Sequence, residues 1–257
     1  MYDRDYYHQR YLNLSFGLSA EKRRSYLFKA RTVALQKVLP KPELILEIGC
    51  GVGHMSKYLA RLPNRPCVHA SDLSEDALGL ARQYLKDEDN IRLHRLDAHA
   101  LPFQENTFHV ITAFDVIEHL SQPSRFAEEA FRTLCLSGIL MISTPNPASL
   151  GYRIKSHNTE RPGQSFAERK LQWFGFRDDT HVNVRSHSSW RKLFEKAGFE
   201  RVRDGSDFWW DVPYFKWMPM LIQRFIFTAT HIILTKIFYF LPWKFGENYI
   251  AIFRKPA

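Results

Sequence analysis

The chain contains the stretch Leu44-Ile45-Leu46-Glu47-Ile48-Gly49-Cys50-Gly51-Val52-Gly53, and this stretch decides the fold. Residues 44–48 are apolar and β-rich apart from Glu47, as expected for a strand buried on both faces of a parallel sheet. Three glycines at alternate positions follow, and residues 54–60 predict the start of a helix. A strand, a glycine turn and a helix bring main chain close to a nucleotide-like ligand, which a Cβ would hold away.

The glycine spacing narrows the class of ligand. A dinucleotide-binding turn has the pattern Gly-x-Gly-x-x-Gly. Here His54 stands where the third glycine is required, and Gly53 precedes it. The spacing therefore does not support phosphate binding at the N-terminus of the following helix.

Further strands and helices alternate along the chain with short links. Apolar runs predict strands at 68–72, 91–96, 108–114, 138–143, 199–202 and 249–253. Periodicity and capping residues predict helices at 20–39, 75–85 (with Ser74 as N-cap), 124–134 and 188–197. This alternation predicts an α/β fold with a Rossmann-like, doubly wound, mostly parallel sheet. In the first helix the apolar side chains form one face, and most basic residues are expected on the opposite side: Lys22, Arg23, Arg24, Lys29 and Arg31.

Composition sets broad bounds on function. The 257 residues carry a net charge of +9, which favours an anionic partner such as nucleic acid, a membrane surface or an acidic substrate, although the basic residues are dispersed. Cys50, Cys67 and Cys135 are far apart and show no metal-binding spacing, which indicates reduced thiols. The N-terminal residues include no apolar signal segment, so we expect a cytoplasmic protein.

Several motifs resemble one family. The pattern Glu-x-Gly-x-Gly-x-Gly at 47–53 resembles motif I of the class I S-adenosylmethionine-dependent methyltransferases. Asp72 follows at roughly 20 residues, where a ribose-binding carboxylate is expected. With Asp97-Ala98 and residues 115–120, the chain is similar to the small-molecule group that includes the ubiquinone-pathway O-methyltransferases. The resemblance is strong from about Pro42 to Asn146, weaker through Phe199, and strong again at 249–254. Residues 143–147 do not have the signature of the nucleic-acid N-methyltransferases.

This resemblance implies an enzyme that uses S-adenosyl-L-methionine as its cofactor. It implies that Asp72 binds the ribose hydroxyls, that Asp97 approaches the adenine amino group, and that Asp115 lies near the methionyl end and the substrate mouth. The predicted cofactor-binding residues are Glu47, Gly49, Cys50, Gly51, Gly53, Asp72, Leu73, Asp97, Ala98 and Asp115.

Two histidines are candidate catalytic residues. Methyl transfer from a sulfonium is an in-line displacement, so the protein must mainly align the reactants and exclude water. A general base helps only where the acceptor is protonated, as a phenol is. His119 and His181 are the candidates, with loop or lid structure as the alternative for each. The resemblance to quinone-pathway enzymes also raises a divalent metal at Asp115, Glu118 and His119 as a weaker alternative to a site without metal.

The expected organisation has four parts. Residues 1–41 form an arm and helix, 42–204 the cofactor-binding core with a lid at 151–185, 205–247 an aromatic and apolar helical insertion, and 248–257 the last strand and tail. In the insertion, residues 220–241 are long enough to cross a membrane. Internal charges and the need to return the last strand to the sheet oppose a crossing. A lid over the active site that also touches a membrane surface is favoured, and a contact between two copies of the chain is a further alternative.

The sequence therefore predicts a methyltransferase that acts on a small, lipophilic acceptor at oxygen or carbon. A sugar, glycan precursor or other polar metabolite is the alternative acceptor, with a basic lid at 153–185 binding phosphate. A nucleic-acid substrate is not expected, since no RNA-binding module is recognisable. A membrane-associated, cofactor-binding protein without turnover is the alternative from another class. The oligomeric state is left open.

Overall fold

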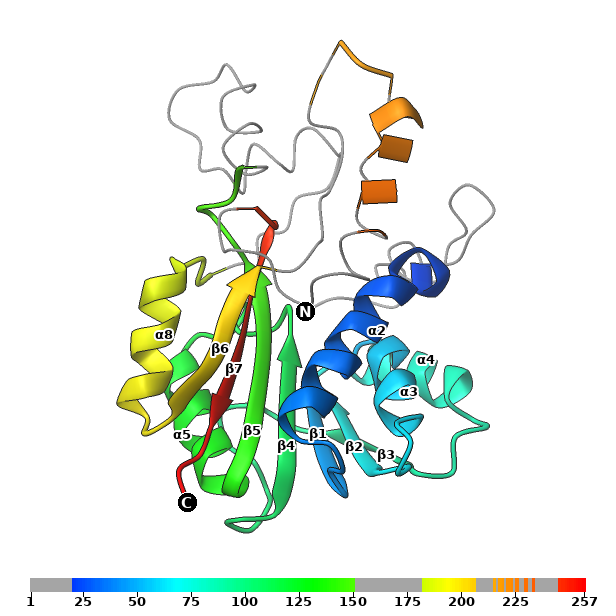
Figure 1. The fold of residues 1–257 in the computed structure, drawn as a ribbon. Coiled ribbons are helices and arrows are strands. Elements are labelled where there is room, and N and C mark those ends of the chain that lie inside the picture. The colour runs from blue at the N-terminus through cyan, green and yellow to red at the C-terminus, as the bar shows by residue number, and fades with distance from the viewer. Residues whose placement is uncertain are drawn as a thin grey trace.

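A computed structural model gives the fold of the chain (Figure 1). It describes residues 20–150, 182–206 and 245–257, and within the insertion residues 215, 217–219, 221–223, 225–226, 229–230 and 233. The N-terminal arm, His181, most of the predicted lid and the rest of the insertion lie outside the described residues.

The described strands form one seven-stranded sheet in the order β3-β2-β1-β4-β5-β7-β6 (Figure 1). Their bounds are β1 Leu44–Ile48, β2 Cys67–Asp72, β3 Ile91–Arg95, β4 Phe108–Phe114, β5 Leu134–Pro145, β6 Glu200–Ser206 and β7 Asn248–Arg254. β1 to β5 are parallel, and β7 runs antiparallel to both β5 and β6. This order confirms the predicted Rossmann-like, doubly wound sheet.

Helices cover both faces of the sheet (Figure 1). Their bounds are α2 Ala20–Val38, α3 His54–Ala60, α4 Glu75–Tyr84, α5 Pro123–Thr133 and α8 His187–Lys196. One buried cluster joins the sheet to α2, α3 and α4, and a second joins it to α5 and α8. Within β1, Ile45 belongs to the first cluster, whereas Leu46 and Ile48 belong to the second. The apolar run at 44–48 is therefore buried on both faces, as predicted.

Two strands extend well beyond their predicted bounds, while β2, β3 and β7 differ from the prediction by one residue at one or both ends. β5 begins at Leu134 rather than 138, because Leu134 already pairs with Phe108 of β4. β6 continues to Ser206 rather than ending at 202, because it pairs with β7 as far as Tyr249. The predicted N-cap is present: the Ser74 hydroxyl accepts a hydrogen bond from the Ala77 amide at the start of α4. No helix among the described residues is long and apolar enough to cross a membrane.

Candidate active site

The three glycines after β1 all have positive φ but meet different surroundings. A Cβ on Gly49 would lie 2.3 Å from Val116 Cγ2, and one on Gly53 would lie 2.5 Å from Leu85 Cδ1. A Cβ on Gly51 would meet nothing within 4 Å. Of the three, only Gly51 therefore borders open space; Gly49 and Gly53 are required because protein side chains lie against them. At all three glycines, contact of the main chain with a ligand stays a prediction.

Asp72 joins the end of β2 to the glycine turn. Its Oδ2 accepts a hydrogen bond from the Gly51 amide at 2.9 Å, and its Oδ1 accepts from the Ser74 amide at 2.9 Å. Burial raises the pKa of this carboxyl, and the backbone amides of Ser74 and Gly51 oppose that rise. The neighbouring Leu73 is exposed. A carboxylate that two backbone amides hold in place beside open space is suited to accept hydrogen bonds from hydroxyl groups.

Glu47 belongs to β1, just before the glycine turn, and its side chain is buried. Its Oε2 accepts from Ser56 Oγ at 2.5 Å, which ties β1 to α3. Burial raises the pKa of Glu47 to about 7. The next predicted residue, Cys50, is also buried, and burial raises the pKa of its thiol. Glu47 therefore fixes β1 to α3, and Cys50 is a buried residue of the turn itself.

Asp97 lies just beyond β3 and holds a histidine that sequence reasoning missed. Its Oδ1 accepts from the His99 amide at 2.9 Å and contacts His99 Nδ1 at 2.6 Å. The amide of His99, helped by its imidazole, lowers the pKa of Asp97. The Gln122 amide lies 3.3 Å from His99 Nε2, so the histidine bridges two loops. The Asp-x-His spacing was the available signal. Ala98 between them is buried.

Asp115 follows β4 in a left-handed conformation, with φ of 58°. Ser143 on β5 donates from Oγ to Asp115 Oδ1 at 2.9 Å, and its carbonyl accepts from the Asp115 amide at 2.9 Å. Arg31 of α2 donates to Ser143 Oγ at 2.9 Å, and its Nη2 lies 3.8 Å from Asp115 Oδ2.

The placement of Arg31 corrects a prediction. It was expected opposite the apolar face of its helix, yet it is only 3% exposed. Arg31 lies four residues from both Leu27 and Leu35, which are buried, so helical periodicity puts all three on one face. The four-residue spacing indicated a buried position for Arg31, but its charge led to the prediction that it faces solvent.

The loop at 115–120 is held by the segment that precedes α8. The Asn183 amide donates to the Glu118 carbonyl at 2.8 Å, and Asn183 Nδ2 donates to the Leu120 carbonyl at 2.5 Å. Glu118 is buried, with Oε1 4.0 Å from His119 Nε2. These contacts agree with a role of the loop in shaping the site. Within the described ranges no three His, Cys, Asp or Glu side chains form a group that could hold a metal ion, and Asp115, Glu118 and His119 form none.

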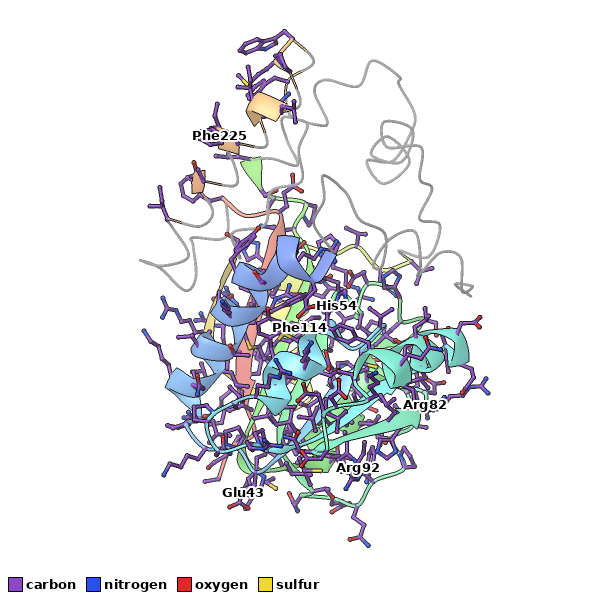
Figure 2. The ribbon with its side chains drawn as sticks, turned by 90° about the vertical axis from the view of Figure 1, so that its right-hand side faces the viewer. Glu43, His54, Arg82, Arg92, Phe114 and Phe225 are labelled. Atoms are coloured by element: carbon purple, nitrogen blue, oxygen red, sulfur yellow. The ribbon has the colours of Figure 1, made fainter. Side chains whose placement is uncertain are left out.

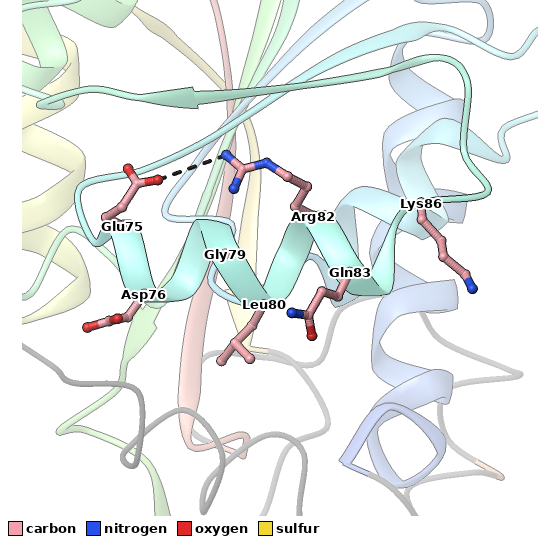
Figure 3. A pocket seen from close by; sticks show the side chains of 7 residues that line it. All are labelled: Glu75, Asp76, Gly79, Leu80, Arg82, Gln83 and Lys86. Carbon is pink, nitrogen blue, oxygen red and sulfur yellow. Dashed lines mark ion pairs between the residues drawn. The ribbon is translucent and has the colours of Figure 1, made fainter.

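A separate hollow lies beside α4 (Figure 3). Its described lining comes from that helix and from Lys86 just beyond its end: Glu75, Asp76, Gly79, Leu80, Arg82, Gln83 and Lys86. Glu75 and Arg82 form an ion pair across it at 3.9 Å, which is an ordinary contact of exposed side chains. None of the predicted cofactor-binding residues lines this hollow.

The sheet thus brings four predicted residues to one edge. Asp72 is the last residue of β2, and Gly51, Asp97 and Asp115 follow β1, β3 and β4; these four strands are adjacent and parallel. In open α/β sheets the carboxyl ends of the strands are where ligands bind. The open side of Gly51 and the acids around it fit an adenosyl cofactor with ribose hydroxyls and an amino group to donate.

Comparisons with known proteins agree with this geometry. The family model for a methyltransferase domain matches residues 19–203, which is more than half of the chain. A probable S-adenosylmethionine-dependent methyltransferase of Mycobacterium tuberculosis is 32% identical over 124 residues, which cover 48% of this chain and 43% of that protein. A mitochondrial ubiquinone biosynthesis O-methyltransferase of Candida albicans is 35% identical over 108 residues, 40% of this chain and 32% of that protein. The chain thus spans less than half the length of these relatives.

A solved structure shows the same fold. The crystal structure of an S-adenosylmethionine-dependent methyltransferase from Aquifex aeolicus has a TM-score of 0.61 at 16% identity, covering 99% of this chain and 100% of the other. The family match, the sheet order and the residues at its edge lead to one conclusion. The chain belongs to the class I S-adenosylmethionine-dependent methyltransferases.

Proposed function

We propose that this methyltransferase acts on a small lipophilic acceptor, at oxygen or carbon. The main observation in support of this proposal is a group of exposed apolar side chains in the insertion between β6 and β7. Trp217 and Phe225 are each 76% exposed, and Leu221, Ile222, Ile226 and Ile233 are exposed as well. Exposed apolar side chains gathered in this way mark a surface that binds an apolar ligand, a protein or a lipid.

These side chains stand on a locally ordered support. Gln223 is buried, and its Nε2 donates to the carbonyls of Phe215 and Met218, each at 2.7 Å. Its Oε1 accepts from the Phe215 amide at 3.0 Å. The side-chain amide therefore fixes Phe215 and Met218 to the helical residues 221–223. The outward position of Trp217 follows from this arrangement.

This part of the insertion lies toward the same end of the sheet as the candidate active site. Glu43 immediately precedes β1, and Figure 2 shows Glu43 and Phe225 at opposite ends of the molecule. Phe225 is therefore toward the carboxyl ends of the parallel strands. An apolar acceptor that binds there would reach the edge that holds Gly51 and Asp115.

The chain's own residues would bind and orient the reactants. Asp72 would accept from the ribose hydroxyls, Asp97 from the adenine amino group, and Asp115 would lie at the methionyl end. When bound, the cofactor supplies an electrophilic methyl group on a sulfonium. For a phenolic acceptor, His119 or His181 would take the proton from the hydroxyl group. The name of the Candida relative, a ubiquinone biosynthesis O-methyltransferase, supports an acceptor of this kind.

Release of S-adenosylhomocysteine tests the acceptor class. The purified protein is given a lipid extract or a polar metabolite extract, and turnover is expected with the lipids. The double variant Leu221→Ser/Phe225→Ser should raise the KM for the lipid fraction. Leu136→Ser is the matched control, since Leu136 is an equally large apolar side chain that is 62% exposed near the start of β5. Turnover with the polar extract alone would overturn the proposal in favour of a sugar or other polar metabolite.

The same surface supports a second part of the proposal, contact with a membrane. An apolar face with tryptophan suits the headgroup boundary of a bilayer, and the net charge of +9 favours anionic lipids. The protein is expected to float with anionic vesicles, and Leu221→Ser/Phe225→Ser should reduce flotation while Leu136→Ser does not. Equal flotation of all three proteins would exclude this role of the insertion.

A further inference from the structure

We propose that Arg31 is a positioning residue for the cofactor site, acting from α2 on Asp115 through the hydroxyl of Ser143. Arg31 lies outside the motifs on which the family resemblance rests. The inference rests on the proposed role of Asp115 at the methionyl end of the cofactor.

Hydrogen-bond chemistry gives this chain of contacts a fixed direction. A guanidinium can only donate, so Ser143 Oγ must accept from Arg31 Nη2 at 2.9 Å. The single hydroxyl proton of Ser143 is then directed to Asp115 Oδ1, also at 2.9 Å. One carboxylate oxygen of Asp115 is thereby held in place. Without Arg31, the hydroxyl could rotate and donate elsewhere.

The guanidinium itself is held tightly. It is 3% exposed, and its Cζ lies 4.4 Å from the ring centroid of Phe114, the last residue of β4. A cation over an aromatic face with little water around it is favourably placed. Its Nη2 also lies 3.8 Å from Asp115 Oδ2. Arg31 thus contacts residues 114, 115 and 143 together, at the ends of β4 and β5.

Asp115 is the residue in this group that can meet a ligand. Ser143 is fully buried, whereas the Asp115 side chain is 45% exposed. Its backbone lies in the left-handed region, which aspartate adopts more readily than most residues other than glycine. The contacts from Ser143 and Arg31 hold its side chain in this position. Packing of α2 on the sheet is therefore part of what orients the exposed part of the carboxylate.

A double-mutant cycle tests the inference. The variants are Arg31→Met, Ser143→Ala, the two combined, and Asp115→Asn, with affinity for S-adenosylhomocysteine measured by calorimetry at a temperature where all are folded. Lys29→Met is the matched control, because it removes a charge from an exposed position of the same helix. We expect Arg31→Met and Ser143→Ala each to weaken binding by about tenfold, and the double variant by no more than Arg31→Met alone. Lys29→Met should leave the affinity unchanged.

Three outcomes would overturn the inference. Multiplicative effects, about a hundredfold in the double variant, would mean that Arg31 does not act through Ser143. Unchanged affinity in Arg31→Met, with only a lower melting temperature, would make Arg31 purely structural. Unchanged affinity in Asp115→Asn would remove the cofactor role of Asp115 itself. A loss in Asp115→Asn with none in Arg31→Met would leave the proposed site standing and refute only the positioning role.

Discussion

Gly49 and Gly51 are two residues apart in one motif, yet substitution by alanine should impair the protein for a different reason at each position. Both have positive φ, where alanine costs about 1–2 kcal/mol. In Gly51→Ala the new methyl group enters the open space predicted for the cofactor. Affinity for S-adenosylmethionine should therefore fall by tenfold or more, on the order of 1.4 kcal/mol, with a modest loss of stability. Calorimetric titration and urea unfolding of the same variant separate the two effects.

Gly49→Ala provides the contrast, since its methyl group would lie 2.3 Å from Val116 Cγ2. Overpacking and the positive φ together should cost about 2–5 kcal/mol of unfolding free energy. Much of that loss should be recovered when Val116→Ala makes room. A stable Gly49→Ala protein, or no recovery with Val116→Ala, would contradict the packing role of Gly49.

Glu47 should make the stability of the protein depend on pH. Burial raises its pKa from 4.5 to about 7 in the folded state. Stability from the protonated carboxyl is thus fully present below pH 4.5 and is lost as pH rises through 7. Glu47→Gln lacks this titration, so its unfolding free energy relative to the parent should increase by up to about 3 kcal/mol between pH 5 and pH 8. Urea unfolding across that range measures the difference, with exposed Glu43→Gln as control. Parallel curves for Glu47→Gln and the parent would refute the buried ionisation.

At the scale of elements, a pair of histidines joins β2 to the edge strand β3. The rings of His69 and His94 stack at 4.8 Å and 7°, and Phe103 and Phe108 meet them edge-on. Burial lowers the pKa of both histidines, and for His69 the neighbouring His94 adds to this. Stability should therefore fall as pH drops through 6.5, where the unfolded chain takes up protons. The double variant His69→Phe/His94→Phe should lose less of its melting temperature between pH 7.5 and 5.5 than the parent. An equal loss would show that the pair does not govern the acid sensitivity.

Prediction from the sequence succeeded for elements whose ends are marked locally. β1 and β4 have the predicted bounds, because each is an apolar run that ends in glycine or aspartate. The extra length of β5 and β6 depends on partner strands distant in sequence, which no local pattern reveals. The same limit applies to the site. The aspartates at the ends of the strands were predicted from their positions in motifs. The roles of Arg31 and His99 depend on contacts between residues that are distant in sequence.

At the scale of the whole molecule, Lys255 contacts two regions that are far from it in the chain, the loop at Asn106 and residues 131–138. Its backbone amide donates to the Gly138 carbonyl, and its Nζ donates to Asn106 Oδ1 and to the Leu134 carbonyl, each at 2.9 Å. Nζ also lies 4.9 Å from the ring centroid of Phe131 on α5. The residue that follows β7 therefore fixes the loop before β4 to the junction of α5 and β5.

Lys255→Met keeps most of the side chain's volume but removes its charge and its donors. Because a hydrogen bond to a charged group contributes about 1.5–3 kcal/mol, the variant should lose on the order of 2 kcal/mol of unfolding free energy. Removal of residues 256–257, which leaves the Lys255 contacts in place, should cost much less. S-adenosylhomocysteine affinity should be retained, because Lys255 lies at the end of the sheet away from the glycine turn. Equal destabilisation by the two changes would show that the tail, rather than the ammonium group, holds this end of the molecule together.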